Sequence, residues 1–182
     1  MRTALYSVIL LAGLGMSACS EPEPRAQAEE RRAVSSDTQG ALEHFKAQDQ
    51  SLQAMLNSSA GWVIFPDVGK GAVVVGGAFG RGEVFDGRGM LIGYATITQA
   101  TVGAQAGAQT FSELIVFNTK EALDKFKGGQ LAFAANASAV LIKAGAAGSS
   151  RPNEGLTIFV QPKGGLMAEA AIGGQKFKFE PI

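Results

Sequence analysis

The feature that most constrains the fold is a series of short, glycine-broken segments rich in Val, Ile, Phe and Thr, which begins after Gly61. β-Branched and aromatic residues favour strands, and glycines end strands or let another backbone approach closely. We therefore expect a mainly antiparallel sheet. The strands expected from this pattern are Trp62 to Phe65, Ala72 to Phe79, Glu83 to Phe85, Leu91 to Thr98, Gly103 to Gln109, Leu114 to Phe117, Leu131 to Ile142, Leu156 to Gln161, Leu166 to Ile172 and Lys176 to Phe179.

Small residues are dense within several of these segments, such as AVVVGGAFG, TVGAQAGAQ and LAFAANASAV. They let a helix or a second backbone come close, and they permit the sharp coiling that a curved sheet needs. The pattern predicts a coiled or partly closed sheet.

Two helices are expected to cover this sheet. Residues 38 to 57 place Leu42, Phe45, Leu52 and Leu56 at spacings compatible with one helical face. Such a helix could cover the sheet or lie on a membrane, and the narrow apolar face without a rim of Lys and Arg favours covering. A short helix is expected over residues 119 to 127, capped by Thr119. The fold class is therefore α+β, predominantly antiparallel β.

The first 18 residues have the layout of a secretory signal peptide. Arg2 carries a positive charge, an apolar run of about 12 residues follows, and three small or apolar residues precede Cys19. The run is shorter than the roughly 20 residues of a membrane-spanning helix. We therefore expect residues 1 to 18 to be removed.

Cys19 is the single cysteine of the chain, and the segment Met16-Ser17-Ala18-Cys19 resembles a bacterial lipobox. In that motif the cysteine accepts a diacylglycerol group and becomes the acylated N-terminus. We predict a lipoprotein anchored in the cell envelope, in the outer membrane facing the periplasm because Ser20 is not an Asp retention signal. Residues 19 to 36 are charged and poor in large apolar residues, so they are expected to form a flexible tether before a domain at 37 to 182.

Composition excludes several classes of function. Without residues 1 to 18 the chain has 15 basic and 16 acidic residues, a net charge near −1 that gives no reason to expect nucleic acid as a partner. The single histidine, His44, has no sequence-level partner for a metal site or a catalytic triad. The glycine runs match neither a phosphate-binding loop nor a dinucleotide fingerprint. We predict no catalytic residues, no metal and no cofactor, and hence no enzyme.

Three basic residues flanked by glycine are the candidate contacts for a phosphate group. They are Lys70 in PDVGKG, Arg81 in GRGE and Arg88 in DGRG, where glycine N–H groups could act as further donors. The same positions are also typical of solvated turn residues.

The ordered motifs of the chain resemble the SYLF domain family over residues 38 to 180. That family is described as lipid-binding and, in its eukaryotic members, also as actin-binding. The resemblance implies one compact, non-enzymatic domain that binds phospholipid headgroups, and in a bacterial envelope it implies an anionic phospholipid membrane as partner and no actin. A structural protein acting through protein contacts, and a small-ligand carrier or enzyme with a cleft in the sheet, remain alternatives. The motifs are AGWVIFPDVGKG at 60–71, GGAFGRGEVF at 76–85, Gly93-Tyr94, VGAQAGAQTFSELIVFNTKEALDKF at 102–126 and KGGLMAEAAIGGQKF at 163–177.

Overall fold

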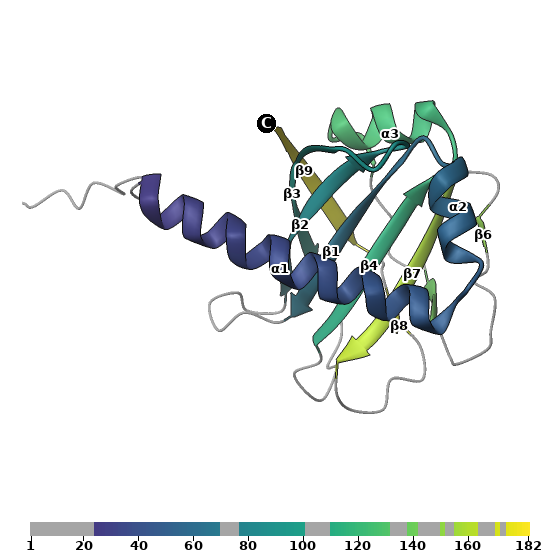
Figure 1. Ribbon diagram of the computed structural model, residues 1–182, viewed down its shortest axis with the longest axis horizontal. Coiled ribbons are helices and arrows are strands. Elements are labelled where there is room, and N and C mark those ends of the chain that lie inside the picture. The colour runs from purple at the N-terminus through teal and green to yellow at the C-terminus, as the bar shows by residue number, and fades with distance from the viewer. Residues whose placement is uncertain are drawn as a thin grey trace, which may run out of the picture.

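A computed structural model describes residues 24–69, 77–100, 110–131, 138–141, 150–151, 155–163, 170–171 and 174–182 of the chain. Two helices precede the first strand, and a third follows the fourth strand (Figure 1). The elements are α1 (Pro24–Gln48), α2 (Leu52–Ser58), β1 (Gly61–Gly69), β2 (Gly77–Asp86), β3 (Leu91–Ala100), β4 (Thr110–Phe117), α3 (Lys120–Lys127), β5 (Ser138–Leu141), β6 (Ser150–Arg151), β7 (Leu156–Lys163), β8 (Ala170–Ala171) and β9 (Gln175–Pro181).

Six antiparallel strands form the main part of the sheet, in the order β7-β4-β1-β2-β3-β9. β5 adds to β7 in parallel, β8 pairs with β5, and β6 also pairs with β7. The sheet is open, because β8 and β9 stand at the two ends of the strand order. The expected α+β fold, with a predominantly antiparallel sheet covered by helices, is therefore confirmed, and the sheet is not closed.

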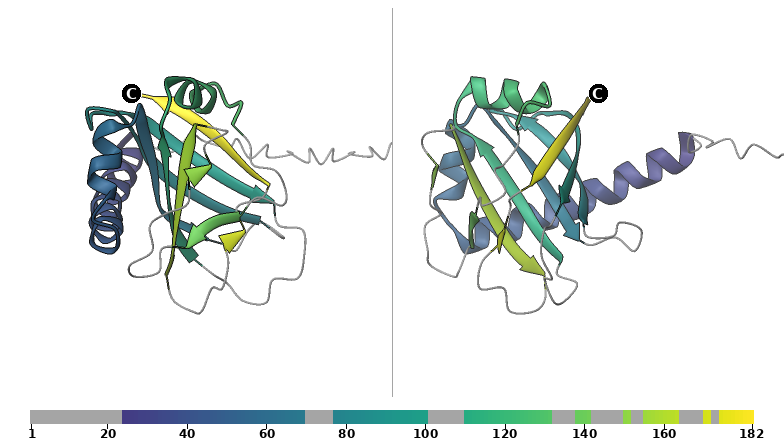
Figure 2. Two further views of the ribbon diagram at one scale, coloured as in Figure 1. Left: turned by 90° about the vertical axis from the view of Figure 1, so that its right-hand side faces the viewer. Right: turned by 180° about the vertical axis from the view of Figure 1, so that it is seen from behind.

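The sheet curls around an apolar interior. Inward side chains of all six main strands meet there, and Phe126 of α3 packs in the same cluster against Phe117 and Phe177. Gln175 of β9 donates a hydrogen bond of 2.8 Å to Glu113 of β4, although three strands separate β9 from β4 in the sheet. Only a strongly coiled sheet brings these two strands together, and α3 covers one end of the enclosed space (Figure 2).

A second apolar cluster lies on the outer side of β1, β4 and β7. Phe45 of α1 and Leu52 and Leu56 of α2 pack there against sheet residues such as Ile64 and Phe159. In Figure 1 α1 and α2 lie across this side of the sheet. The prediction that the first helical segment covers the sheet is therefore confirmed.

The expected helix 38–57 differs from the structure at its start and in its middle, and its end agrees to within one residue. It is divided into α1 and α2 at Asp49, whose side chain accepts hydrogen bonds from the N–H and the hydroxyl of Ser51. The helix also begins earlier, at Pro24, so residues 24 to 36 are helical and not the flexible tether that was expected. Ala, Glu, Gln and Arg favour helix, and Pro is suited to the first helical position.

The short helix and most strands agree with the sequence pattern. Thr119 caps α3 by accepting a hydrogen bond of 3.3 Å from the N–H of Ala122, as expected. Of the expected strand at residues 131 to 142, the described part contains only β5. The expected strand at residues 103 to 109 and most of that at residues 166 to 172 lie outside the described residues.

Candidate functional site

The outward side of β2, β3 and β9 carries two rows of mainly polar side chains, most of which are exposed. Strand register places Arg81 opposite Thr96 and Thr96 opposite Lys178, while the neighbouring row joins Phe79, Thr98 and Lys176. Side chains alternate between the two sides of a strand, so the residues between them point inward. Ala95, Ile97 and Phe177 are accordingly buried. We call this surface the basic face; its residues are Phe79, Arg81, Thr96, Thr98, Lys176 and Lys178.

Positive charge is in excess on and beside the basic face. Arg81, Lys176 and Lys178 are all exposed, and Phe79, 39 % exposed, lies beside them. Lys178 donates a hydrogen bond of 2.7 Å to Glu180 on the same strand. The guanidinium group of Arg81 lies 5.7 Å from the centre of the Phe79 ring, within the range of a cation–π contact.

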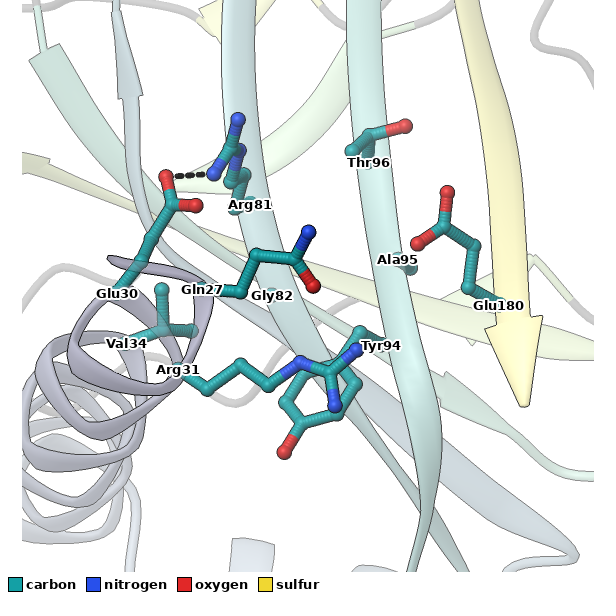
Figure 3. Close-up of a pocket in the computed structure, with 10 residues that line it drawn as sticks. All are labelled: Gln27, Glu30, Arg31, Val34, Arg81, Gly82, Tyr94, Ala95, Thr96 and Glu180. Carbon is teal, nitrogen blue, oxygen red and sulfur yellow. Dashed lines mark ion pairs between the residues drawn. The ribbon is translucent and has the colours of Figure 1, made fainter. Parts of the chain in front are cut away.

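A pocket of about 280 Å³ opens where the first turns of α1 lie over the basic face (Figure 3). Helix α1 supplies one wall, and β2, β3 and β9 supply the floor and the opposite wall. We call it the α1 pocket. Its lining residues are Gln27, Glu30, Arg31, Val34, Arg81, Gly82, Tyr94, Ala95, Thr96 and Glu180.

Two contacts join α1 to the sheet across this pocket. Glu30 forms an ion pair with Arg81, in which both side chains are about half exposed. The guanidinium group of Arg31 stands over the ring of Tyr94, 4.7 Å from its centre (Figure 3). These contacts explain why residues expected to be a tether lie against the domain.

The carboxyl group of Glu180 is held in its charged form. The hydrogen bond from Lys178 is the main cause that lowers its pKa, and the positive charges of Lys178, Arg31 and Arg81 add to the effect. Glu180 therefore faces the two arginines as an anion.

A third row on the same side of the sheet pairs Glu83 with Tyr94 and Tyr94 with Glu180. Glu83 is buried, and α1 covers it with Thr38 and Ser35. Burial raises the pKa of Glu83, and the nearby hydroxyl groups of Thr38 and Ser35 offset part of that increase. Glu83 is not among the residues that line the α1 pocket.

The structure separates the basic residues selected from the sequence. Arg81 is in the middle of β2 and not in a loop, and it belongs to the basic face. Arg88 is in the β2–β3 turn and bonds Asp86 at 2.9 and 3.0 Å, beyond the far end of the strand. Asp86 is five positions after Arg81 along β2, a distance of roughly 16 Å, so Arg81 and Arg88 do not form one cluster. Lys70 and Cys19 lie outside the described residues.

Sequence reasoning did not select Lys176, Lys178, Arg31 and Glu180. One signal was available, because the alternation in QKFKFE places both lysines on the side of the strand opposite the phenylalanines. Their proximity to Arg81 could not be inferred, since it depends on β9 pairing with β3.

The structure gives no sign of a catalytic centre in the part it describes. Nε2 of His44 lies 3.2 Å from the side-chain nitrogen of Gln161. No group of three His, Cys, Asp or Glu side chains among the described residues is placed to hold a metal ion. None of the described helices combines the length and apolar character needed to cross a bilayer.

A comparison with family models finds a match to part of the chain. The family model named Ysc84 and described as "Las17-binding protein actin regulator" matches residues 98–180. This range includes β4, α3 and β9, and thus two lysines of the basic face. No curated protein matches the chain. The resemblance to the SYLF family is confirmed over the matched range.

Proposed function

We propose that this chain, whose residues 98–180 match the Ysc84 family model, is a membrane-tethered, non-enzymatic protein whose basic face binds phospholipid headgroups. The SYLF domain of this family is linked to lipid or actin binding. The observation that carries the proposal is the pairing of cations and threonine hydroxyls in adjacent rows across three strands.

The chemistry of these rows suits phosphate groups at a membrane surface. Arg and Lys form charge-assisted hydrogen bonds with phosphate oxygens, and threonine hydroxyls between them act as further donors. Four cations, Arg31, Arg81, Lys176 and Lys178, stand against the exposed carboxylates Glu30 and Glu180. The local excess of positive charge favours an anionic membrane although the whole chain has a net charge near zero.

The position of α1 is consistent with an acylated Cys19. Pro24, the first residue of the helix, is five positions after Cys19, and these five steps along the chain span at most about 17 Å. The α1 pocket is formed by the first turns of that helix. An anchor at Cys19 would therefore hold the pocket and the basic face close to the lipid surface, which we place in the outer membrane facing the periplasm.

We expect Arg81→Gln, Lys176→Gln and Lys178→Gln together to lower binding to anionic vesicles by about tenfold to a hundredfold at low salt, because each cation near such a surface contributes about 1 kcal/mol. Vesicle flotation of a chain that begins at Ser20 measures this without the anchor. That chain keeps every residue that the structure describes, and all the contacts given above lie within residues 24–182.

The matched control removes the same charge from α3, by Lys120→Gln, Lys125→Gln and Lys127→Gln. These lysines are exposed on α3, which lies at one end of the sheet (Figure 2), and none of them is a residue of the basic face. Lys127 stands 5.8 Å from the centre of the Phe179 ring, which packs against the inner cluster on the side of β9 opposite the basic face. Binding of the unchanged chain should weaken as salt is raised to physiological strength, since exposed charges are then screened. Equal losses in the two triple variants would show that net charge, and not the basic face, causes the binding.

We expect Cys19→Ala to release the full chain from the membrane or to stop its processing. Buried acyl chains contribute roughly 0.8 kcal/mol per CH₂, far more than the charged segment after Cys19 could supply. Immunoblots of membrane fractions washed with high salt measure the effect, with Ser20→Ala as the control that keeps the thiol. A Cys19→Ala chain that is processed normally and stays in the washed membrane would contradict the anchor.

A further inference from the structure

We propose that the α1 pocket binds one zwitterionic headgroup that carries both a phosphodiester and a primary ammonium group, as a phosphoethanolamine headgroup does. The inference rests on the proposed function for the source of the ligand, a phospholipid, but the pocket itself defines the chemistry. The α1 pocket would then select the type of headgroup, whereas the basic face would attract any anionic membrane surface through its charge.

The charges that line the pocket are balanced. Arg31 and Arg81 are positive, Glu30 and Glu180 are negative, and α1, β2 and β9 each contribute to the set. A purely anionic group would be repelled by the two carboxylates, and a simple cation by the two guanidinium groups. A ligand that carries one negative and one positive charge complements both the two guanidinium groups and the two carboxylates.

The phosphate end of the ligand would lie between the two arginines. Arg31 stacks on the ring of Tyr94 at 4.7 Å, which fixes the plane of the guanidinium group and leaves its N–H edge available for an oxyanion. Arg81 lies across the pocket from it, and Thr96, opposite Arg81 in the register, adds a hydroxyl donor (Figure 3). The ion pair with Glu30 holds Arg81 at the pocket and can exchange with a phosphate oxygen.

The ammonium end would lie against Glu180. Figure 3 shows this side chain on the side of the pocket opposite α1. Lys178 bonds one of its two carboxylate oxygens at 2.7 Å, so the second oxygen can accept an N–H from the ligand. A primary ammonium has three such donors, whereas the quaternary nitrogen of choline has none.

The size of the pocket also suits a headgroup. A volume of about 280 Å³ corresponds to roughly nine waters in the liquid, and it is just below the range of pockets that hold drug-sized ligands. A phosphoethanolamine group fits in this space, while acyl chains would have to remain in the bilayer.

The test compares two sets of vesicles with the same fraction of phosphatidylglycerol, in which the remaining lipid is either phosphatidylcholine or phosphatidylethanolamine. The chain that begins at Ser20 should bind the phosphatidylethanolamine vesicles about three- to tenfold more tightly. Glu180→Gln should remove this preference, and Glu121→Gln, at an exposed position on α3, should keep it.

A second arm uses soluble glycerophosphoethanolamine and glycerophosphocholine, with NMR shifts of the backbone amides of Gly82 and Ala95 as the readout. The first compound should shift these amides and the second should not. Equal shifts with the two compounds, measurable but equal binding to the two kinds of vesicle, or an unchanged preference in Glu180→Gln would overturn the inference. The proposed function would survive that result if the basic-face variant still lost binding to anionic vesicles. Shifts with soluble glycerophosphoethanolamine but no vesicle binding would support the pocket and contradict the membrane function.

Discussion

The free energy of unfolding should fall as the pH rises from 4.5 to about 8, and Glu113→Gln should remove most of this dependence. Glu113 is fully buried in the interior of the curled sheet, among Phe65, Ile115 and other apolar side chains. Burial raises the pKa of Glu113 from 4.5 to about 8, and the hydrogen bond from Gln175 offsets only part of that increase. At neutral pH the folded protein therefore keeps this carboxyl group protonated.

The hydrogen bonding of Glu113 agrees with a neutral acid. Nε2 of Gln175 donates to Oε2 of Glu113 at 2.8 Å. The other side-chain oxygens of both residues are buried and have no partner within the described part of the chain. Two oxygens without hydrogens cannot bond each other, whereas a protonated Oε1 of Glu113 can donate to Oε1 of Gln175. The proton would complete an acid–amide pair that joins β4 to β9.

The sign of the pH effect follows from the two pKa values. The stabilising contribution of a protonated Glu113 is complete below pH 4.5, where the unfolded chain is protonated as well. It is lost as the pH rises, because the unfolded chain releases its proton first and the folded chain releases it only near pH 8. A shift of this size corresponds to a loss of up to about 5 kcal/mol over that range.

Urea denaturation at a series of pH values measures this dependence. Glu113→Gln keeps the volume and the hydrogen-bonding capacity of the side chain, so its unfolding free energy should vary less with pH. A smaller slope should remain from Glu83, whose pKa burial also raises. Glu121→Gln on α3 is the exposed control and should behave as the unchanged chain does. The same slope in the unchanged chain and in Glu113→Gln would contradict a buried neutral acid.

Local patterns in the sequence were sufficient where a residue's neighbours along the chain determine its structure. Thr119 and the apolar positions Leu123 and Phe126 predict α3 because capping and helical spacing are local. The alternation in QKFKFE predicts β9 for the same reason. The small residues predicted a curled sheet because only small side chains permit close backbone contacts.

The rest depended on contacts between distant parts of the chain. Glu113 is the single acidic residue in the β4 segment FSELIVF. Nothing in that segment indicates that its hydrogen-bond partner is Gln175 on the edge strand β9. The glycines beside Arg81 indicated a loop, whereas they are strand residues packed against β1. The segment from Pro24 lacks large apolar residues and was expected to be a tether, but its helix is joined to the sheet through Glu30 and Arg31.

The glycines of β2 have a steric role at the point where β1 bends. The register between β1 and β2 shifts between Ile64 and Asp67, which marks a bulge or irregularity in β1. A Cβ atom at Gly82 would lie 2.2 Å from the carbonyl oxygen of Ile64, and one at Gly80 would lie 2.7 Å from that of Asp67. Because the nearest atoms belong to the backbone, the two strands would have to separate to accommodate even a methyl group.

Gly82→Ala should therefore destabilise the fold by about 3 kcal/mol, at the upper end of the cost of overpacking. Gly40→Ala is the matched control, because a Cβ atom there would meet nothing within 4 Å and the residue lies within α1. Alanine favours a helix interior over glycine by about 1 kcal/mol, so this variant should be more stable than the unchanged chain. Urea denaturation of the two variants at one pH should thus show shifts of opposite sign. An unchanged midpoint for Gly82→Ala would mean that β1 and β2 do not approach closely at the bend, and that small residues in β2 are not what allows the sheet to curl.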